Sequence, residues 1–535
     1  MRVFVTVLLS GAAWLAPWGS WSHAAQLPAL PQLLIDTSYF APYGNRIVVK
    51  AGDDLQRAID RAEPGDMIVV QAGATFTGPF TLPDKTRGFG WIYIQSSAYA
   101  SLPPPGSRIT AADAAHMPRI TVRASGRSAI ETKANAHHYR FVGIEFAPAP
   151  GTFIYNLVSV GTGGRSAADL PHDITFDRCY IHGDPVAGGR RGVIMDGVRV
   201  AVIDSRVADF KESGADSQAV LAYNTPGPLK VANNYLEASG ENLMLGGADP
   251  QIPDALPSDV EIRRNHFFKP LAWMGSKWTV KNLLELKLGR RVLVEGNVFE
   301  NNWLAAQDGE AIVITPRNQD GGAPWSATQD ITIRSNRILN VGKGINIAGI
   351  DDDYRSQRTR RVLIENNVID VTGLGKATAR IFQFVSGPDN VTVRHNTGFT
   401  IARGASVMAA LTPKTDQFDF RDNLLSLGSY GFFGDAVGEG SAALAAYFSN
   451  YSFRGNAVIG GATRNYPADN FFPADTAAVR FLDYGGRDYR LSAFSPFKNA
   501  GTDGKDIGAD IDAIEEAIAG SGPRRLAAPD LRSAH

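Results

Sequence analysis

Short runs of alternating apolar and polar residues recur along the central part of the chain, and most of them end on asparagine. In one such run Val292 and Val294 stand two positions apart before Asn297. This period-two alternation predicts β-strands with one buried face. Copies that carry asparagine occupy 229–234, 260–265, 292–297, 331–336, 362–367, 391–396, 418–423 and 451–456, and weaker copies put Ser205, Cys179 and Ile144 in the asparagine position.

The spacing of these runs narrows the architecture. Successive asparagines stand roughly 30 residues apart, which is typical of solenoids, propellers and other repeat arrays. Helical heptads are absent, and no Asn-Gly or Asp-Gly hairpin signal recurs in each repeat, so helical solenoids and propellers are disfavoured. A parallel β-helix explains the asparagines, because equivalent amides on successive coils form a hydrogen-bonded ladder. Asparagine also favours isolated turns, but its recurrence with matched flanking strands favours the ladder.

Two short helices are expected near the ends of this stack. Residues 55–62 carry apolar side chains at helical spacing, and the turn at 64–66 separates them from a strand at 67–70. A helix there would cover the open edge of the first coil. Residues 511–519 are a second amphipathic segment. We therefore expect an all-β fold, a single right-handed parallel β-helix of about ten to twelve coils with an N-terminal capping helix and a short C-terminal helix and tail.

The N-terminus has the pattern of a secretory signal peptide. Arg2 precedes the apolar stretch 3–15, and small residues lead to a cleavage site after Ala24, with Ala25 as the alternative. A transmembrane anchor is disfavoured because Pro17 and Gly19 interrupt the apolar stretch. We expect residues 1–24 to be the signal peptide, 25–130 the N-terminal cap and first coils, 131–475 the β-helix core and 476–535 the closing segment.

Composition and charge restrict the partners. Lys plus Arg number 53 and Asp plus Glu number 54, and a net charge of −1 argues against a nucleic-acid-binding protein. Cys179 is the single cysteine of the 535 residues, so the chain has no intramolecular disulfide. No segment beyond the signal peptide is apolar enough for stable membrane insertion. We expect a monomer that is secreted or periplasmic in a bacterium.

Both ends of the predicted β-helix resemble a known superfamily. The opening resembles right-handed parallel β-helix proteins of the pectin-lyase-like superfamily, especially the alginate lyase and chondroitinase B group, and the closing segment is similar to theirs. The matching residues are Leu55, Gln56, Ala58, Ile59, Pro64, Gly65, Asp66 and Gly73 in the opening, and Asp488, Ser495, Pro496, Gly501, Asp503, Gly504, Asp506 and Gly508 in the closing segment. The resemblance implies the fold more than the activity, because the superfamily holds lyases, hydrolases, epimerases and non-enzymatic adhesins.

One strand per coil aligns by its inward apolar pair, and the alignment predicts two outward columns. The central column comprises Ile194, Leu221, Met244, Glu285, Val313, Asn346 and Gln383. The following column comprises Asp196, Tyr223, Gly246, Lys287, Thr315, Ala348 and Val385. Polar residues gather in the middle coils, and Arg317 follows two residues after Thr315. A long outward column on a β-helix suits a polymeric substrate.

This residue set fits β-elimination on an acidic, uronic-acid polysaccharide. Such an enzyme neutralises the sugar carboxylate, removes the proton alpha to it and protonates the leaving oxygen. We predict Lys287 as base and Arg317 as carboxylate neutraliser, with Glu285 as partner of Lys287 or metal ligand and with Tyr223, Glu285, Asn346 and Gln383 contacting substrate. The resemblance further implies a Ca²⁺ ion as possible cofactor. Glu285 and Lys287 could equally be a solvated strand pair of little energetic weight.

Other candidates and functions have weaker support. The acidic turn 351–353 could bind Ca²⁺ or be a surface turn, and Trp273, Trp278, Trp303 and Trp325 could form sugar platforms or pack loops. Zinc-site spacing among the histidines and the aspartate set of polygalacturonases are not found. The alternatives to a lyase are therefore a non-catalytic β-helix that binds carbohydrate or the cell surface and, with less support, a glycoside hydrolase.

Overall fold

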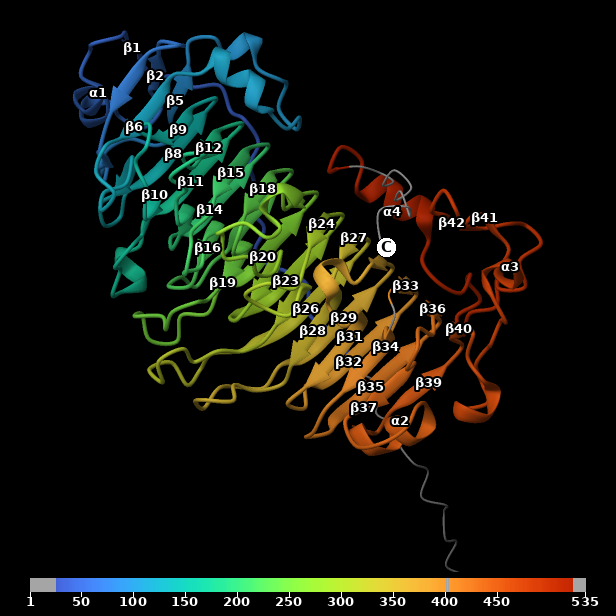
Figure 1. The fold of residues 1–535 in the computed structure, drawn as a ribbon. Helices are drawn as coiled ribbons and strands as arrows, with labels where there is room; N and C mark the ends of the chain where they lie inside the picture. Colours follow the sequence, from blue (N-terminus) through green and yellow to red (C-terminus); the bar gives the residue numbers. More distant parts are fainter. Residues whose placement is uncertain (1–25, 401, 403, 523–535) are drawn as a thin grey trace, which may run out of the picture.

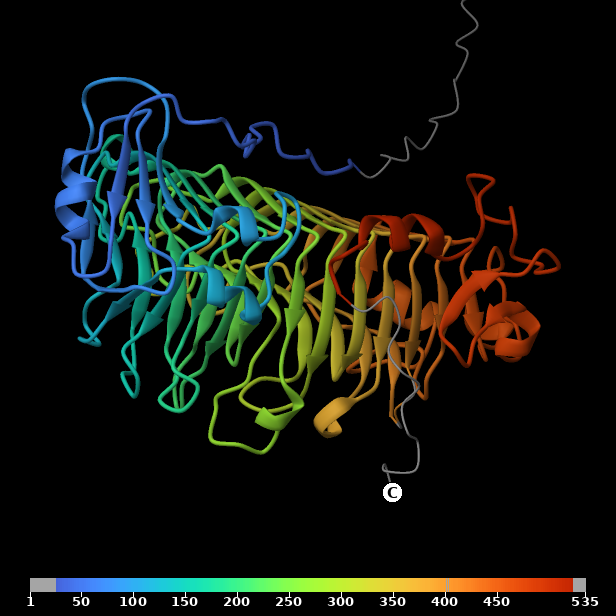
Figure 2. The same cartoon turned by 90° about the horizontal axis from the view of Figure 1, so that it is seen from above.

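The strands of the protein wind into coils that stack along one axis. The computed structural model describes residues 26–522 apart from 401 and 403, so the predicted signal peptide lies outside the described residues. One coil runs through β17 (Leu229–Ala232), β18 (Tyr235–Ala238) and β19 (Glu241–Leu245) before β20 (Ser258–Arg263) pairs in parallel with β17. Repetition of this path builds three long parallel sheets (Figure 1, Figure 2). The predicted parallel β-helix is confirmed.

The three sheets contain 15, 13 and 12 strands. The 15-stranded sheet comprises β1 (Arg46–Val49), β2 (Met67–Val70), β5 (Ile92–Ser96), β8 (His137–Val142), β11 (His172–Asp177), β14 (Val198–Ile203), β17, β20, β23 (Gly289–Glu295), β26 (Thr328–Arg334), β29 (Arg360–Glu365), β32 (Asp389–Arg394), β35 (Thr415–Arg421), β38 (Phe448–Ser449) and β39 (Ser452–Arg454). The 13-stranded sheet comprises β3 (Thr75–Thr77), β6 (Arg119–Val122), β9 (Glu145–Pro148), β12 (Tyr180–His182), β15 (Arg206–Phe210), β18, β21 (His266–Phe268), β24 (Val298–Asn302), β27 (Arg337–Val341), β30 (Val368–Val371), β33 (Thr397–Thr400), β36 (Leu424–Ser426) and β40 (Ala457–Ile459).

The 12-stranded sheet carries the predicted site. It comprises β4 (Phe80–Leu82), β7 (Ile130–Thr132), β10 (Asn156–Val160), β13 (Arg191–Met195), β16 (Gln218–Ala222), β19, β22 (Leu284–Leu286), β25 (Glu310–Ile314), β28 (Lys343–Ala348), β31 (Arg380–Val385), β34 (Ser406–Ala410) and β37 (Phe432–Gly434). The predicted inward pairs of this sheet, from Val193 and Met195 to Phe382 and Phe384, all belong to the main hydrophobic core.

The asparagine ladder forms as predicted. From Asn234 to Asn456 each side-chain amide donates to the amide oxygen of the next coil, with nitrogen–oxygen distances of 2.9 to 3.0 Å. Upstream, the Ser205 hydroxyl takes the equivalent place and accepts the Cys179 backbone N–H. Downstream, Asn470 adds a rung that the sequence pattern did not predict, because no strand of the repeat precedes it.

The first and last coils are each closed by a helix. Helix α1 (Leu55–Arg61) begins after the N-cap Asp54 and buries Leu55, Ala58 and Ile59 in the core, where the sequence predicted a helix. Strand β1 precedes it and adds an edge that was not predicted. At the other end α2 (Ser441–Tyr447) buries Leu444 in the core. Hydrophobic ends are thereby kept from water at both edges of the stack.

The C-terminal segment differs from expectation in its position. It contains α3 (Thr476–Val479), the hairpin β41 (Phe481–Asp483) and β42 (Asp488–Leu491), and α4 (Ile511–Ala517). We expected this last helix at the end of the stack, but it lies along the outer face of the 13-stranded sheet (Figure 2). Ile511, Ile514 and Ile518 there cover the apolar outward residues Val298, Leu339, Val368, Phe399 and Leu424. The helix lies on this face because the outward apolar residues of the sheet have to be covered from water.

Residues 26–44, which we name the N-terminal strap, lie against the outer face of the 15-stranded sheet (Figure 2). The Ala29 N–H donates to Asp330 at 3.1 Å, and the Gln32 N–H donates to Asp259 at 2.8 Å. Ile35 packs against Ala201 of β14. The strap therefore contacts strands from several coils, which nothing in the repeat pattern predicted.

Candidate active site

The outward columns of the 12-stranded sheet have the predicted register. Glu285 pairs with Met244 on one side and Val313 on the other, and Asn346 pairs with Val313 and Gln383. Inward apolar pairs therefore align a β-helix sheet correctly from sequence, because a slip of one residue would expose the whole pair.

Lys287, Glu285 and Arg317 lie together on adjacent coils. The Lys287 ammonium is 3.8 Å from a Glu285 carboxylate oxygen, and the Arg317 backbone N–H donates to the Lys287 carbonyl at 3.0 Å. The side chain of Glu285 is 3% exposed, whereas that of Lys287 is 14% exposed. Lys287 therefore presents its ammonium outward from a carboxylate that is otherwise covered.

The guanidinium of Arg317 is already engaged. It lies 2.5 Å from Asp351 and 3.6 Å from Asp353, so the acidic turn that we weighed as a Ca²⁺ site or surface turn holds this arginine. Burial opposes ionisation of Asp351, but hydrogen bonds from the Asp353 and Asn318 backbone and from Arg317 lower its pKa. A substrate carboxylate that binds Arg317 would share the guanidinium with Asp351.

The flanking coils carry the remaining predicted substrate contacts. Tyr223 is half-buried, and burial raises its pKa. Its backbone N–H donates to Asp196, a fully buried carboxyl whose pKa burial raises to about 6. Gln383 accepts a hydrogen bond from Arg380, and Asn346 lies beside Gln383 in the column. These side chains line the same face as Lys287, although Tyr223 lies two coils before it.

A third outward column was missed in the sequence. It stands two residues before each inward pair and is polar in each of seven coils: Arg191, Gln218, Glu241, Asn282, Glu310, Lys343 and Arg380. We name it the charged column. Strict alternation would have placed this position inward. The residue between it and the pair also enters the core, as Leu283, Ala311 and Ile381 do, so the alternation is interrupted there.

Glu241 is the most perturbed member of the charged column. Its carboxyl is fully buried and accepts the Gln218 amide at 2.8 Å, while Lys281 stands 3.9 Å away. Burial, followed by the charge of Glu285, raises the pKa of Glu241 to about 8. Burial and the neighbouring carboxyl thus both favour the protonated form of Glu241.

The charged column continues with partners on both sides of Glu285. The Asn282 amide donates to Glu285 at 3.3 Å and to Gln307 at 2.6 Å. Lys343 lies 3.4 Å from Glu310, whose pKa burial raises. The described partners of Glu285 are thus an ammonium and an amide N–H, both hydrogen donors. A Ca²⁺ ion needs six to eight oxygen ligands, so this surrounding does not fit the Ca²⁺ that the family resemblance implied.

Three of the four tryptophans that the sequence singled out gather beside the sheet. Trp273 and Trp303 pack with Val280, and Trp278 lies against them. These loop tryptophans therefore pack mainly against one another, which was one of the two interpretations of their clustering. Trp325 lies in a different loop and donates to the Ala255 carbonyl.

Parallel sheets joined coil by coil and an internal amide ladder define the class of this protein, a parallel β-helix, as the repeats of the sequence predicted. No protein-family model and no curated protein matches the sequence. The chain is, however, similar to several solved structures.

Three solved structures illustrate the fold. The catalytic unit of an α-1,3-glucanase from Streptomyces thermodiastaticus matches 83% of this chain and 72% of its own, with 14% identity and a TM-score of 0.48. The alginate lyase AlyGC matches 90% of this chain and 59% of its own, with 14% identity and a TM-score of 0.45. The A-module of the Azotobacter vinelandii mannuronan C-5 epimerase AlgE4 matches 78% and 100%, with 11% identity and a TM-score of 0.38. These likenesses describe the fold alone.

Proposed function

We propose that the protein is an exported enzyme that cleaves an acidic polysaccharide by β-elimination on the outer face of the 12-stranded sheet. One observation carries this proposal: the partly exposed ammonium of Lys287 stands 3.8 Å from the covered carboxylate of Glu285, with Arg317 on the next coil. A base, a charge that orients it and a cation for the sugar carboxylate are the groups this reaction requires.

The reaction divides among these residues as follows. Arg317, shared with Asp351, binds the carboxylate of the uronic acid and stabilises the charge that develops beside it. Neutral Lys287 takes the proton from the carbon alpha to that carboxylate. The carbon–carbon double bond forms as the bond to the leaving oxygen breaks. That oxygen takes up a proton from water, and Lys287 returns the proton that it removed to water. A lysine serves as base after losing its own proton, so we expect activity to rise toward alkaline pH.

The face around these residues is suited to a charged polymer. Arg191, Lys281 and Arg380 repeat along it and are half-buried, so their charged ends lie at the surface of the sheet. The net charge of the chain is −1. Attraction of a polyanion therefore depends on these local cations, and it should weaken at high ionic strength. We further propose that the protein acts as a secreted or periplasmic monomer. Within the described residues no helix is long and apolar enough to cross a membrane.

The test is a panel of alginate, pectate and glycosaminoglycans, with and without added Ca²⁺, followed by the ultraviolet absorbance of unsaturated products. We expect product from at least one polymer and a loss of roughly 100-fold or more in kcat for Lys287→Ala. Lys414→Ala is the matched control, because Lys414 is exposed on a turn beyond the site. If no polymer gives product, the proposal that the protein is a lyase is refuted.

The same panel separates the alternatives. Retention of a polymer without product, unchanged in Lys287→Ala, indicates a non-catalytic binding protein. New reducing ends without ultraviolet absorbance indicate hydrolysis. Hydrolysis has its own structural basis, because Glu241 and Glu285 are carboxyls on adjacent coils and burial raises the pKa of Glu241. Glu241→Gln would then abolish the reaction while leaving polymer retention intact.

A further inference from the structure

A cluster of metal-ligating side chains lies far from the proposed active site, where the C-terminal segment meets the β-helix. His395 and Asp422 stand directly before the ladder residues Asn396 and Asn423 on adjacent coils. Asp503 approaches them from the loop between β42 and α4. One ligand atom from each of His395, Asp422 and Asp503 lies within 4.8 Å of the others. The three residues are distant in sequence, which is why histidine spacing did not reveal them.

The side chain of His395 is oriented by its other nitrogen. Its Nδ1 lies 3.2 Å from the backbone carbonyl of Asp506, so Nδ1 carries a hydrogen and donates it. Its Nε2 faces Asp503 Oδ2 at 3.2 Å and Asp422 Oδ2 at 3.7 Å. A neutral imidazole with hydrogen on Nδ1 would direct its lone pair at two carboxylate oxygens, which is repulsive. A metal ion between these three atoms would turn that repulsion into attraction.

Both carboxylates are also held in place by other hydrogen bonds. Asp422 accepts the backbone N–H and the hydroxyl of Thr502, each at 2.7 Å. Asp503 accepts the Lys505 backbone N–H with Oδ1, which leaves Oδ2 directed at His395. Metal ligands in proteins are commonly oriented in this manner by a second layer of hydrogen bonds.

The distances and the ligand types favour zinc over the hard cations. Zn²⁺ bonds nitrogen and oxygen at about 2.0–2.2 Å, so tetrahedral ligands stand roughly 3.3–3.6 Å apart. The observed 3.2 and 3.7 Å bracket this range. An imidazole nitrogen is a poor ligand for Ca²⁺ or Mg²⁺ but a usual one for Zn²⁺. The side chain of Asp422 is fully buried and that of His395 is 10% exposed, so a bound ion would be screened little by water.

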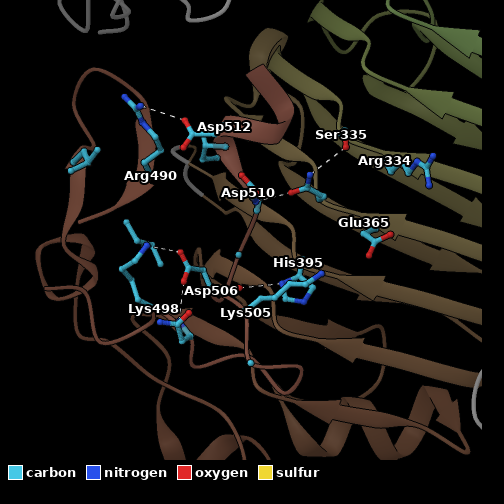
Figure 3. A pocket seen from close by; sticks show the side chains of 18 of the residues that line it. Arg334, Ser335, Glu365, His395, Arg490, Lys498, Lys505, Asp506, Asp510 and Asp512 are labelled. Atoms are coloured by element: carbon cyan, nitrogen blue, oxygen red, sulfur yellow. Dashed lines mark hydrogen bonds and ion pairs between the residues drawn. The ribbon is translucent and has the colours of Figure 1, made fainter. Parts of the chain in front are cut away.

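A cavity gives access to this cluster. A hollow of about 830 Å³ lies between the 15-stranded sheet and the C-terminal segment, and His395, Lys505 and Asp506 are among its lining residues. Figure 3 shows His395 at the wall of this cavity, beside the segment that carries Lys505 and Asp506. Water from the cavity can supply a fourth ligand. Lys505 and Arg421 each approach one carboxylate at 3.8 Å, and Lys505 is exposed enough to move away.

We propose that His395, Asp422 and Asp503 bind one divalent metal ion of the zinc class, which fastens the C-terminal segment to the β-helix. The ion bonds to Nε2 of His395 and to one oxygen of each aspartate. Asp503 belongs to the C-terminal segment, and the other two ligands belong to the coils. Metal binding therefore favours the state in which the C-terminal segment is packed against the coils.

The test uses the full chain, stripped with a chelator and dialysed, and titrated with ZnCl₂ by calorimetry at neutral pH. We expect one bound ion per chain and slower amide exchange in residues 499–508. Asp503→Asn should weaken binding roughly 10-fold or more. Its side chain is 34% exposed, so this variant is expected to fold, which circular dichroism checks. Asp512→Asn is the matched control, because Asp512 is 78% exposed in the same segment.

A second group has to be distinguished in the same titration. His138, His172 and Asp173 are also close enough to hold a metal ion, but both oxygens of Asp173 are engaged by Arg199. We expect His172→Asn to keep the full affinity for zinc. Equal affinity in Asp503→Asn and the unmodified chain, loss of binding in His172→Asn, or no binding of zinc at all would each overturn the proposal.

Discussion

Replacement of one ladder asparagine tests whether the internal amides hold the coils together. Asn336 accepts the backbone N–H and the side-chain N–H of Asn297, each at 2.9 Å. It also donates to the Val294 carbonyl at 2.9 Å and to Asn367 at 3.0 Å. All of these groups lie inside the stack, where water does not replace a lost partner.

The cost of Asn336→Ala follows from the groups left unpaired. Two buried N–H donors of Asn297 lose their acceptor, and each unsatisfied donor costs about 1–3 kcal/mol. Two carbonyl-type oxygens each lose one donor, which costs less because an oxygen can accept a second bond. We therefore expect a local destabilisation of about 4 kcal/mol, which is roughly a thousandfold in the equilibrium for opening.

Amide hydrogen exchange is the suitable assay, because a solenoid of this length need not unfold in one step. Peptides that contain Asn297 should exchange faster in Asn336→Ala, while peptides from β1 and β2 should not change. Asn336→Ser should lose about half as much stability against local opening. Ser205 fills the equivalent position in the native ladder, where its hydroxyl accepts one N–H and donates to one carbonyl. Unchanged exchange in the alanine variant, or equal damage from serine, would refute the reasoning.

Three further predictions concern buried ionisable groups. The pKa of Glu241 is raised from 4.5 to about 8, so the stability that its protonated carboxyl contributes is complete below pH 4.5 and is lost as pH rises through 8. The denaturant midpoint of the unmodified chain should therefore fall between pH 5 and pH 8. The midpoint of Glu241→Gln should fall less over the same range. Lys269 is fully buried and donates to three backbone carbonyls and to Asn242 at 2.5–3.1 Å, so Lys269→Met should lower the free energy of unfolding by about 3–5 kcal/mol, and an unshifted denaturant midpoint would contradict this. Burial raises the pKa of Cys179 to about 12, so a thiol reagent at pH 8 should leave the native chain unlabelled and react after unfolding; labelling without denaturant would show that the coil opens.

The repeating part of the fold was predictable because its physical cause is local and repeated. Each coil must bury an apolar pair and pair its amide with the next, so Val292, Val294 and Asn297 carry the information for their own coil. Packing against neighbouring coils then fixes the register, which is why the outward columns were aligned correctly.

The surroundings of the site were less predictable, because loops decide them. Period-two alternation identifies Glu285 as outward, and outward residues of a sheet are usually exposed. Glu285 is nevertheless 3% exposed, and Asn282 links it to Gln307 of the loop after Trp303. The engagement of Arg317 by Asp351 likewise depends on how the turn after β28 folds back, which no repeat specifies. The position of the C-terminal segment depends on outward apolar residues such as Phe399, a signal that was present in the sequence but was not used.

The N-terminal strap sets an order on the assembly of the molecule. The hydrogen bond from Ala29 to Asp330 joins residues 301 positions apart, and the one from Gln32 to Asp259 joins residues 227 apart. The strap is synthesised before the coils, yet the surface that it binds does not exist until β26 has stacked on the coils before it. Pulse-labelled refolding should therefore protect the Ala29 amide after those of β26, and earlier protection would contradict this order. A stack held together mainly by contacts between neighbouring coils thus acquires a contact that forms only when most of the stack is complete.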